Sequence, residues 1–347
     1  MNIKIKKIIS LDKFIDKSLY NKDYGYYMKK NPFGEKGDFI TSPNISVLFS
    51  EMVCIWIVSL WKKLNKPEKI NIVELGAGNG EMMFNIIKTS KQFLFFKSVC
   101  NFFIYEKSPY LKKIQKEKLK NFKVNWLKKL NQINNGPAVF IGNEFFDSLP
   151  IKQFIKKNNN WFEKYVDTYS KNKKFVEKKI NIKKIEKKIG INISKDQKFI
   201  EFSPLMFQLI KEISNIINKK NGGLLIIDYG YFNKKMFDTL QSVKKHKKTH
   251  ILNNVGNSDI THLLNYKLIK EIVKKFKLKT NGLTTQRKFL IKLGIIQRAE
   301  IISKNVPFSL KVDIYYRLRR LIDSKQMGDV FKVMFISNKK INFKLGF

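Results

Sequence analysis

Three groups of residues in this sequence have the types and spacing that suit the binding of a charged small molecule. The first is the run NIVELGAGNG, which holds Glu74, Gly76, Gly78 and Gly80. Glycines let the backbone pass close to a ligand, and the helix expected next offers free N–H groups at its amino terminus. A dinucleotide-binding loop has its third glycine one position later, where this chain has Glu81, whose carboxylate would repel a pyrophosphate. The pattern is instead typical of loops that bind S-adenosylmethionine; a purely structural strand-to-helix turn is the alternative.

The second group is the apolar run NFFIYE, which ends at Glu106. A carboxylate at the carboxyl end of the second strand of a nucleotide-binding sheet accepts hydrogen bonds from the ribose hydroxyls. We therefore expect Glu106 to contact the cofactor's ribose. The alternative interpretation is a surface acid that precedes a helix.

The third group lies in the run AVFIGNEFFDSLP, where an apolar strand leads to Asn143, Glu144 and Asp147. Open α/β sheets bind their ligands at the carboxyl ends of the strands. If the residues after Gly142 form a helical turn, Glu144 and Asp147 face the same way. Two such carboxylates suit a guanidinium, and methyl transfer to it requires positioning and charge balance. The sequence predicts Glu144, Asp147 and Asn143 as catalytic residues, with Asn143 also in reach of the cofactor; the alternative is that the two acids cap a helix.

The elements that must position these residues follow a βαβ rhythm. Short apolar runs at 70–75, 102–106, 138–142 and 224–228 are predicted strands, and 81–89 is a predicted helix. Strands that are apolar on both faces belong in a parallel sheet covered by helices on each side. The fold class is therefore α/β, with a Rossmann-like sheet.

Four segments are expected along the chain. Residues 1–68 form a helical segment with predicted helices at 11–19 and 47–64, the second capped by Ser46 or Asn44, and between them the irregular loop NPFGEKGDFITSPNIS. Residues 69–151 form the first half of the core, and residues 152–198 break the rhythm as an inserted hairpin and helix, either a lid or a solvated surface insertion. Residues 199–347 form the second half, with a last strand at 331–336.

Several stretches together resemble a known family, the class I methyltransferases of the MidA type. These are GYY, GEKGDFITSP, ELGAGNG, NEFFDSLP, DYG, TTQRKFLIKLGI and MGDVFKVM, which are spread over almost the whole chain. The resemblance implies that the GDFITSP loop folds over the cofactor, with Asp38, Thr41 and Ser42 near it, and that NEFFD lines the acceptor pocket. The chain departs from the family pattern at Asn44, where a glutamate is usual, and at Ala77 and Asn79, where proline and arginine are usual.

The same resemblance implies an activity: methylation of an arginine in a protein, namely the quinone-site subunit of respiratory NADH dehydrogenase, in support of complex I assembly. Two alternatives stay open. One is a nucleic-acid base methyltransferase, because Asn143 followed by Phe145 and Phe146 faintly resembles a loop that binds a base amine and stacks on its ring. The other is a non-catalytic assembly chaperone that binds S-adenosylmethionine.

Composition adds weaker constraints. The net charge of +41 would favour a polyanion, but lysines spread along the chain, with abundant Ile, Asn and Phe, are also what an AT-rich genome produces, so a nucleic-acid partner is not favoured. Cys54 and Cys100 lie in apolar runs and are predicted to be buried thiols.

The three histidines lack metal-site spacing and are expected on the surface or in loops, so no metal is predicted. No run approaches the ~20 apolar residues of a membrane span, which places the protein in the cytoplasm; a homodimer is left open.

Overall fold

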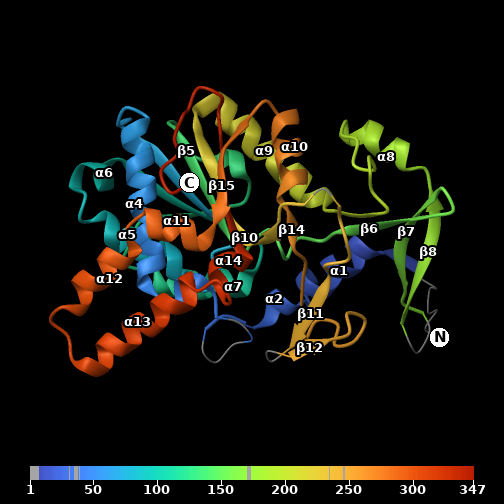
Figure 1. Ribbon diagram of the computed structural model, residues 1–347, viewed down its shortest axis with the longest axis horizontal. Helices are drawn as coiled ribbons and strands as arrows, with labels where there is room; N and C mark the ends of the chain where they lie inside the picture. Colours follow the sequence, from blue (N-terminus) through green and yellow to red (C-terminus); the bar gives the residue numbers. More distant parts are fainter. Residues whose placement is uncertain are drawn as a thin grey trace.

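The computed structural model describes residues 8–30, 32–34, 38, 40–169, 173–233, 235–244 and 247–347. At its centre is a mostly parallel sheet (Figure 1). Its strands, in spatial order, are β4 (Val124–Leu127), β3 (Cys100–Tyr105), β2 (Ile70–Leu75), β5 (Ala138–Asn143), β10 (Gly222–Tyr231), β16 (Phe331–Ser337) and β15 (Lys279–Thr285), with β14 (Leu264–Asn265) beside the end of β10. Only β16 runs against its two neighbours. This is the Rossmann-like α/β sheet that the sequence predicts.

Alternation along the strands divides the core into two layers. On β2, Ile70 and Ile72 pack into one layer, whereas Val73 and Leu75 pack into the other. Successive side chains of a strand point to opposite faces, so a run that is apolar at every position must be covered on both. Helices therefore lie on both faces of the sheet.

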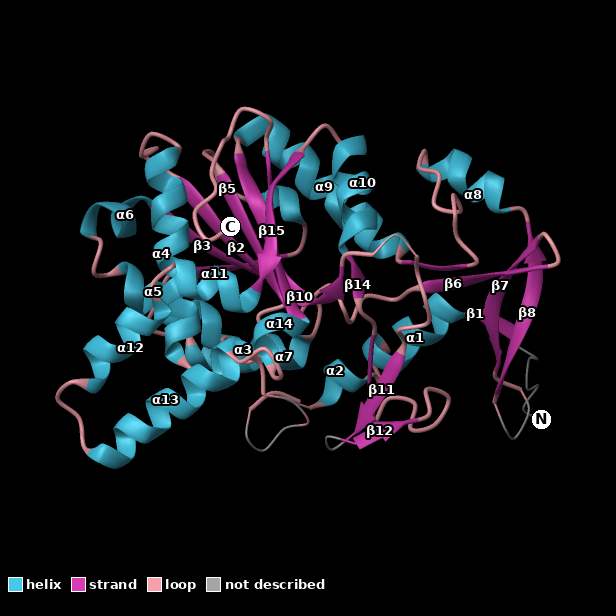
Figure 2. Cartoon of the chain, viewed as in Figure 1, coloured by secondary structure: helices cyan, strands magenta, loops and turns pink. Residues whose placement is uncertain are grey.

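The helices that cover the two faces come from different parts of the chain (Figure 2). One layer contains α4 (Val47–Lys63), α5 (Glu81–Ser90), α6 (Leu94–Val99), α11 (Gln286–Lys292), α12 (Ile295–Ser303) and α13 (Phe308–Ile322). The other contains α9 (Pro204–Lys220) and α10 (Tyr266–Lys275). The remaining core helices are α7 (Pro109–Lys118), the short 3-10 turn η1 (Leu130–Gln132) and α14 (Met327–Val330).

The amino-terminal segment packs against the insertion. A second, antiparallel sheet joins β1 (Ile8–Ser10) to β6 (Lys152–Lys157), β7 (Asn160–Asp167), β8 (Lys174–Ile180) and β9 (Phe199–Phe202). Helix α1 (Leu11–Tyr20) packs against β1, β6 and β7, α2 (Tyr26–Lys29) packs against α1, and α8 (Ile182–Ile189) follows β8 in the chain. A third sheet consists of β11 (Gln241–Lys244), β12 (Lys247–Thr249) and β13 (Asp259–Thr261). The hairpin and helix predicted for the insertion are confirmed, and Figure 1 shows them projecting from the central sheet. Its function as a lid stays a prediction.

The loop between the first helices contains a further short helix, α3 (Ser42–Ile45), and residues 35–37 and 39 of its GEKGDFITSP motif lie outside the described residues. Ser46 caps α4 as predicted, since its Oγ accepts the N–H of Leu48. Both cysteines are free thiols; Cys54 is buried and Cys100 partly so. No helix in the described part of the chain is long and apolar enough to cross a membrane.

Candidate active site

The glycine run forms the tight turn that the sequence predicts between β2 and α5. Gly76, Gly78 and Gly80 have φ of 63°, 52° and 83°, left-handed values that residues with a Cβ rarely adopt. A Cβ on Gly76 would lie 2.6 Å from the ring of Phe145, and one on Gly78 would lie 3.3 Å from Phe33. The turn therefore needs glycine for its backbone and for the two aromatic rings that lie against it.

Two neighbouring cavities open at this edge of the sheet. The larger, of about 250 Å³, is bounded by Tyr20, Tyr27, Phe33, Gly76, Gly78, Tyr105, Glu106, Lys107, Leu111, Glu144, Phe145, Ser148, Leu149, Leu205 and Leu209. The smaller, of about 30 Å³, is bounded by Phe33, Thr41, Pro43, Asn44, Glu74, Gly76, Ala77, Gly78, Asn79, Glu81, Met82, Asn143 and Glu144. Among the residues that the structure describes, Phe33, Gly76, Gly78 and Glu144 bound both cavities, and of these only Glu144 is ionisable.

Glu144 is held at this junction by a strained backbone and by three donors. Its φ is +49°, in the left-handed region, and such strain is common at functional sites. Its carboxylate accepts hydrogen bonds from Ser42 N (3.1 Å), Asn143 Nδ2 (3.2 Å) and Tyr229 Oη (3.4 Å). Burial raises the pKa of Glu144 to about 7, with the three donors acting in the opposite direction. The group can thus exchange a proton near neutral pH.

The segment after Glu144 is irregular, and Asp228 holds it in place. The helical turn that would align Glu144 with Asp147 is absent, and no helix begins here for these acids to cap, because residues 144–150 turn without forming a helix. Asp228 is completely buried within β10, three residues before the strand ends, and its carboxylate accepts the backbone N–H groups of Phe146, Asp147 and Tyr229. These three hydrogen bonds, all from backbone groups of the chain itself, give Asp228 a structural role.

Glu106 lies at the end of β3, as predicted, and bounds the larger cavity. Its two carboxylate oxygens accept hydrogen bonds from Ser108 N (2.9 Å) and Gln115 Nε2 (3.1 Å). Burial raises the pKa of Glu106, and these donors act against that shift. A fixed carboxylate beside a largely apolar cavity is suited to bind the hydroxyls of a sugar.

The smaller cavity contains unsatisfied buried acceptors. Glu74 is 3% exposed, and its Oε2 has no hydrogen-bond partner among the described residues; Asn143 Oδ1 is likewise buried without a partner. Burial raises the pKa of Glu74 to about 8. Unpaired buried acceptors are costly, so these two atoms fit a ligand that brings donors and positive charge, such as an ammonium group.

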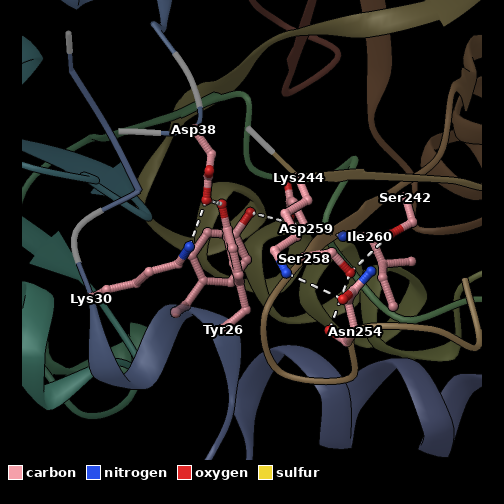
Figure 3. A network of polar contacts seen from close by, with 10 residues as sticks. Tyr26, Lys30, Asp38, Ser242, Lys244, Asn254, Ser258, Asp259 and Ile260 are labelled. Atoms are coloured by element: carbon pink, nitrogen blue, oxygen red, sulfur yellow. Dashed lines mark hydrogen bonds and ion pairs between the residues drawn. The ribbon is translucent and has the colours of Figure 1, made fainter. Parts of the chain in front are cut away.

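Four of the predicted residues lie outside both sets of cavity residues. Ser42 nevertheless supports the site, through its bond to Glu144. Gly80 is the N-cap of α5 and packs against Gln115. Asp38 binds the hydroxyl of Tyr26 (2.7 Å) and the ammonium of Lys30 (2.6 Å), which Figure 3 shows pointing toward it. Asp147 is buried, and burial together with the charges of Asp228 and Asp259 raises its pKa well above the ordinary range.

The structure also adds residues that the sequence did not single out. Tyr20 and Tyr27 bound the larger cavity from α1 and α2; Tyr20 Oη lies 3.1 Å from Ser148 Oγ, and Tyr27 Oη donates to Asp259 Oδ1 at 2.8 Å. Asp259, on β13, is buried. The GYY motif, part of the family resemblance, was the only signal that pointed to Tyr27. The amino-terminal helices therefore form one wall of the site.

Asn44 and Asn79, two of the three departures from the family pattern, contact each other. Asn79 Nδ2 donates to Asn44 Oδ1 (2.8 Å), Asn44 Nδ2 donates to Thr41 Oγ1 (2.7 Å), and Asn79 Oδ1 accepts the N–H of Glu81. The pair joins the GDFITSP loop to the glycine turn. A neutral hydrogen bond here stands where the family pattern has opposite charges.

This contact gives a first prediction. Asn79→Ala and Asn44→Ala should each weaken binding of S-adenosylhomocysteine, and the double variant should bind about as the weaker single variant does, because both remove the same bond. The expected coupling is on the order of 1 kcal/mol. Titration calorimetry on the four proteins measures it, and fully additive losses would contradict a shared contact.

The histidines and phenylalanines of the sequence hypotheses differ in their burial. His262 lies in the loop between β13 and β14, as expected, but it is buried there, and burial lowers its pKa to about 4. His250 is exposed, and His246 lies outside the described residues. Among the described residues no group of His, Cys, Asp or Glu is arranged to hold a metal ion. Phe146 is completely buried in the core, so only Phe145 of the two phenylalanines could stack on a ligand.

Comparison with known proteins agrees with this geometry. A family profile described as "Putative S-adenosyl-L-methionine-dependent methyltransferase" matches residues 52–284. The chain is 28% identical to the protein arginine methyltransferase NDUFAF7 of Xenopus tropicalis, over 93% of this chain and 81% of that protein. It is also 28% identical to the human protein of that name, over 93% and 78%.

The fold has a close counterpart among solved structures. A protein from Burkholderia thailandensis, crystallised with S-adenosyl-homocysteine, superposes with a TM-score of 0.84 at 21% identity, covering 98% of this chain and 90% of that one. Since the family profile spans most of the chain, including every strand from β2 to β14 and all but the last residue of β15, the chain belongs to this family of S-adenosylmethionine-dependent methyltransferases.

Proposed function

We propose that the enzyme methylates an arginine of a protein substrate and that Glu144 is the catalytic carboxylate. The observation that carries this proposal is the position of Glu144, the one ionisable side chain among the described residues that bound both cavities. The vertebrate relatives, which are named protein arginine methyltransferases, support the choice of acceptor. By the MidA resemblance, the substrate is the quinone-site subunit of respiratory NADH dehydrogenase.

The proposed residues divide the work of binding between the cavities. Glu106 would bind the ribose of S-adenosylmethionine in the larger cavity, and Glu74 and Asn143 would bind its amino-acid end in the smaller one, with the glycine turn between them. When bound, the cofactor supplies an electrophilic methyl group on a positively charged sulfur. The unsatisfied Glu74 Oε2 and Asn143 Oδ1 are the atoms that support this fit.

Glu144 would act on the acceptor. A guanidinium has five donors in a planar fork and keeps its charge in water, so its carboxylate partner both orients it and balances its charge. As the new N–C bond forms and the S–C bond breaks, the acceptor nitrogen loses a proton, and a carboxylate with a pKa near neutrality can take it. Asp228, which fixes the backbone on either side of Phe146, is a positioning residue.

The test of the acceptor is direct. Mass spectrometry of the quinone-site subunit should show an arginine that is methylated when this protein is present and unmodified when it is absent. Identical arginine methylation in the two samples would remove this substrate.

The raised pKa of Glu144 predicts a pH profile. Only the ionised carboxylate can balance the guanidinium and accept its proton, so kcat should rise about tenfold per pH unit below the pKa of about 7 and level off above it. Initial rates from acid to mildly alkaline pH measure this. Glu74→Gln separates the two buried acids: it removes a group with a pKa of about 8, and the inflection near 7 should persist. If the inflection moves or disappears in Glu74→Gln, the pH profile reports the titration of Glu74, and its assignment to Glu144 is wrong.

A further inference from the structure

The few arginines of this chain are informative because lysine is used almost everywhere else. Only five of the 69 basic side chains are arginines: Arg287, Arg298, Arg317, Arg319 and Arg320. Three of them lie within four residues on α13. A guanidinium offers a rigid planar fork that an ammonium cannot reproduce. The contacts of each arginine in this lysine-rich chain therefore indicate what its fork binds.

Contacts within the chain account for three of the five. Arg298 binds both carboxylate oxygens of Glu51, at 2.8 and 3.1 Å. Arg317 binds Asp313 (2.7 Å) and the carbonyl of Ile45 (3.1 Å), which fastens α13 to α3, and Arg319 binds Asp323 (3.2 Å). Arg287 is exposed on α11. Arg320 differs from these: it is only partly exposed, yet it has no hydrogen bond or ion pair with the residues that the structure describes.

Arg320 bounds a concave site beside α13. This α13 pocket, of about 240 Å³, is bounded by Gly34, Ile40, Asn44, Ile45, Asp313, Tyr316, Arg317 and Arg320. Asn44 separates two spaces: it bounds both the α13 pocket and the smaller active-site cavity. A group that binds in the α13 pocket would therefore lie next to the methyl-donor site without entering it.

An apolar row on α13 leads into this pocket. Phe308, Val312 and Tyr316 are 81%, 52% and 61% exposed, and with Arg320 they follow at intervals of four residues, so each neighbours the next on the helix surface. The helices α12 and α13 form a hairpin that projects from the body at the lower left of Figure 1. Large apolar side chains that are this exposed are expected at sites of protein contact.

We propose that the α13 row and pocket form a docking site for an acidic segment of the protein substrate. Arg320 binds a carboxylate of that segment, and apolar side chains of the segment pack against Phe308, Val312 and Tyr316. This rests on the proposed function, because it gives the protein substrate a second contact beside the one at Glu144. The charge of +41 favours an acidic partner and opposes a second copy of the chain. The carboxylate of Asp313 also bounds the pocket. Its negative charge repels a run of phosphates more strongly than it repels a single carboxylate, so the pocket favours an acidic side chain over a nucleic acid.

The number of arginines makes the test simple. In a protein labelled with 15N at arginine, the five Nε–Hε groups give separate NMR signals, and Arg320→Lys identifies the signal of Arg320. The probe is a synthetic helical peptide with leucines and one glutamate at intervals of four. The control peptide carries glutamine in place of the glutamate, and an RNA oligonucleotide is the third probe.

The glutamate peptide should shift the Arg320 signal saturably and leave that of Arg298 in place, and the glutamine peptide should bind about tenfold more weakly. Arg320→Lys should weaken binding of the glutamate peptide by a similar factor, whereas Arg319→Lys, one residue away and paired with Asp323, should not. Equal binding of the two peptides, an unmoved Arg320 signal, or tighter binding of RNA than of the glutamate peptide would overturn the proposal.

Kinetics give a second readout. With the protein substrate, Arg320→Lys should raise KM about tenfold and leave kcat and the affinity for S-adenosylhomocysteine unchanged. A drop in kcat with KM unchanged would contradict docking. The peptide titration needs no turnover, so failure to methylate the respiratory subunit would remove the proposed substrate and leave the test of the docking site standing.

Discussion

Glu144→Gln is expected to lower kcat by about 100- to 1,000-fold while S-adenosylhomocysteine binds within about threefold of its affinity for the wild-type enzyme. Glutamine has the shape of glutamate, and its Oε1 can still accept the N–H of Ser42 and the Nδ2 donor of Asn143. The local structure should therefore persist. What is lost is the negative charge that balances the guanidinium and the group that accepts its proton.

Two companion variants separate chemistry from strain. Glu144→Gly should relieve the left-handed backbone at φ +49°, so it should be at least as resistant to urea as Glu144→Gln and equally inactive. Glu144→Asp keeps the charge but withdraws it by one methylene and should retain more activity than Glu144→Gln. Single-turnover rates with saturating cofactor measure all three. A Glu144→Gln enzyme that transfers methyl groups at the wild-type rate would remove Glu144 from the chemistry.

Asp228→Ala should produce the largest loss of stability among single changes at the site, with a decrease of about 3 kcal/mol in the free energy of unfolding. The carboxylate is completely buried and accepts three backbone N–H groups, at 2.9 Å from Phe146, 3.2 Å from Asp147 and 2.9 Å from Tyr229. Alanine leaves those donors buried without acceptors. Activity should fall as well, because the same bonds fix the segment that follows Glu144.

Asp228→Asn gives the matched comparison. One amide oxygen can still accept the N–H groups of Phe146 and Asp147, while the amide nitrogen faces the N–H of Tyr229, so this variant should lose less than alanine does. Urea unfolding followed by fluorescence, together with kcat at a temperature where each variant is folded, measures both effects. If alanine and asparagine leave the unfolding midpoint unchanged, the three backbone bonds do not hold the turn.

The sequence is sufficient to predict the elements whose residues repeat with the period of the structure. The strand at 70–75 is observed with the same bounds, and the helix predicted at 81–89 is observed as Glu81–Ser90. Both are strongly apolar and end in glycine or a polar turn, so local pattern and tertiary packing agree. Strand β4 was not predicted, because Val124–Leu127 is short and has only two buried positions.

Parts of the site depend on contacts that leave no local pattern. The expected helical turn after Gly142 is absent because Asp228, more than 80 positions away, binds the backbone of that segment. Tyr27 and Asp259 meet across 232 positions, and Asp259 lies on a strand of three residues. Glu144, by contrast, could be found from its place at a strand end, since the carboxyl ends of parallel strands meet at one edge of the sheet.

A crystal structure with S-adenosylhomocysteine tests most directly whether Glu144 stands between methyl donor and acceptor. The sulfur should lie beside the Glu144 carboxylate, with the ribose hydroxyls on Glu106 and the ammonium on Glu74 or Asn143. If the ligand instead binds with its sulfur remote from Glu144, or with Glu106 and Glu74 both out of reach, the assignment of these carboxylates is wrong.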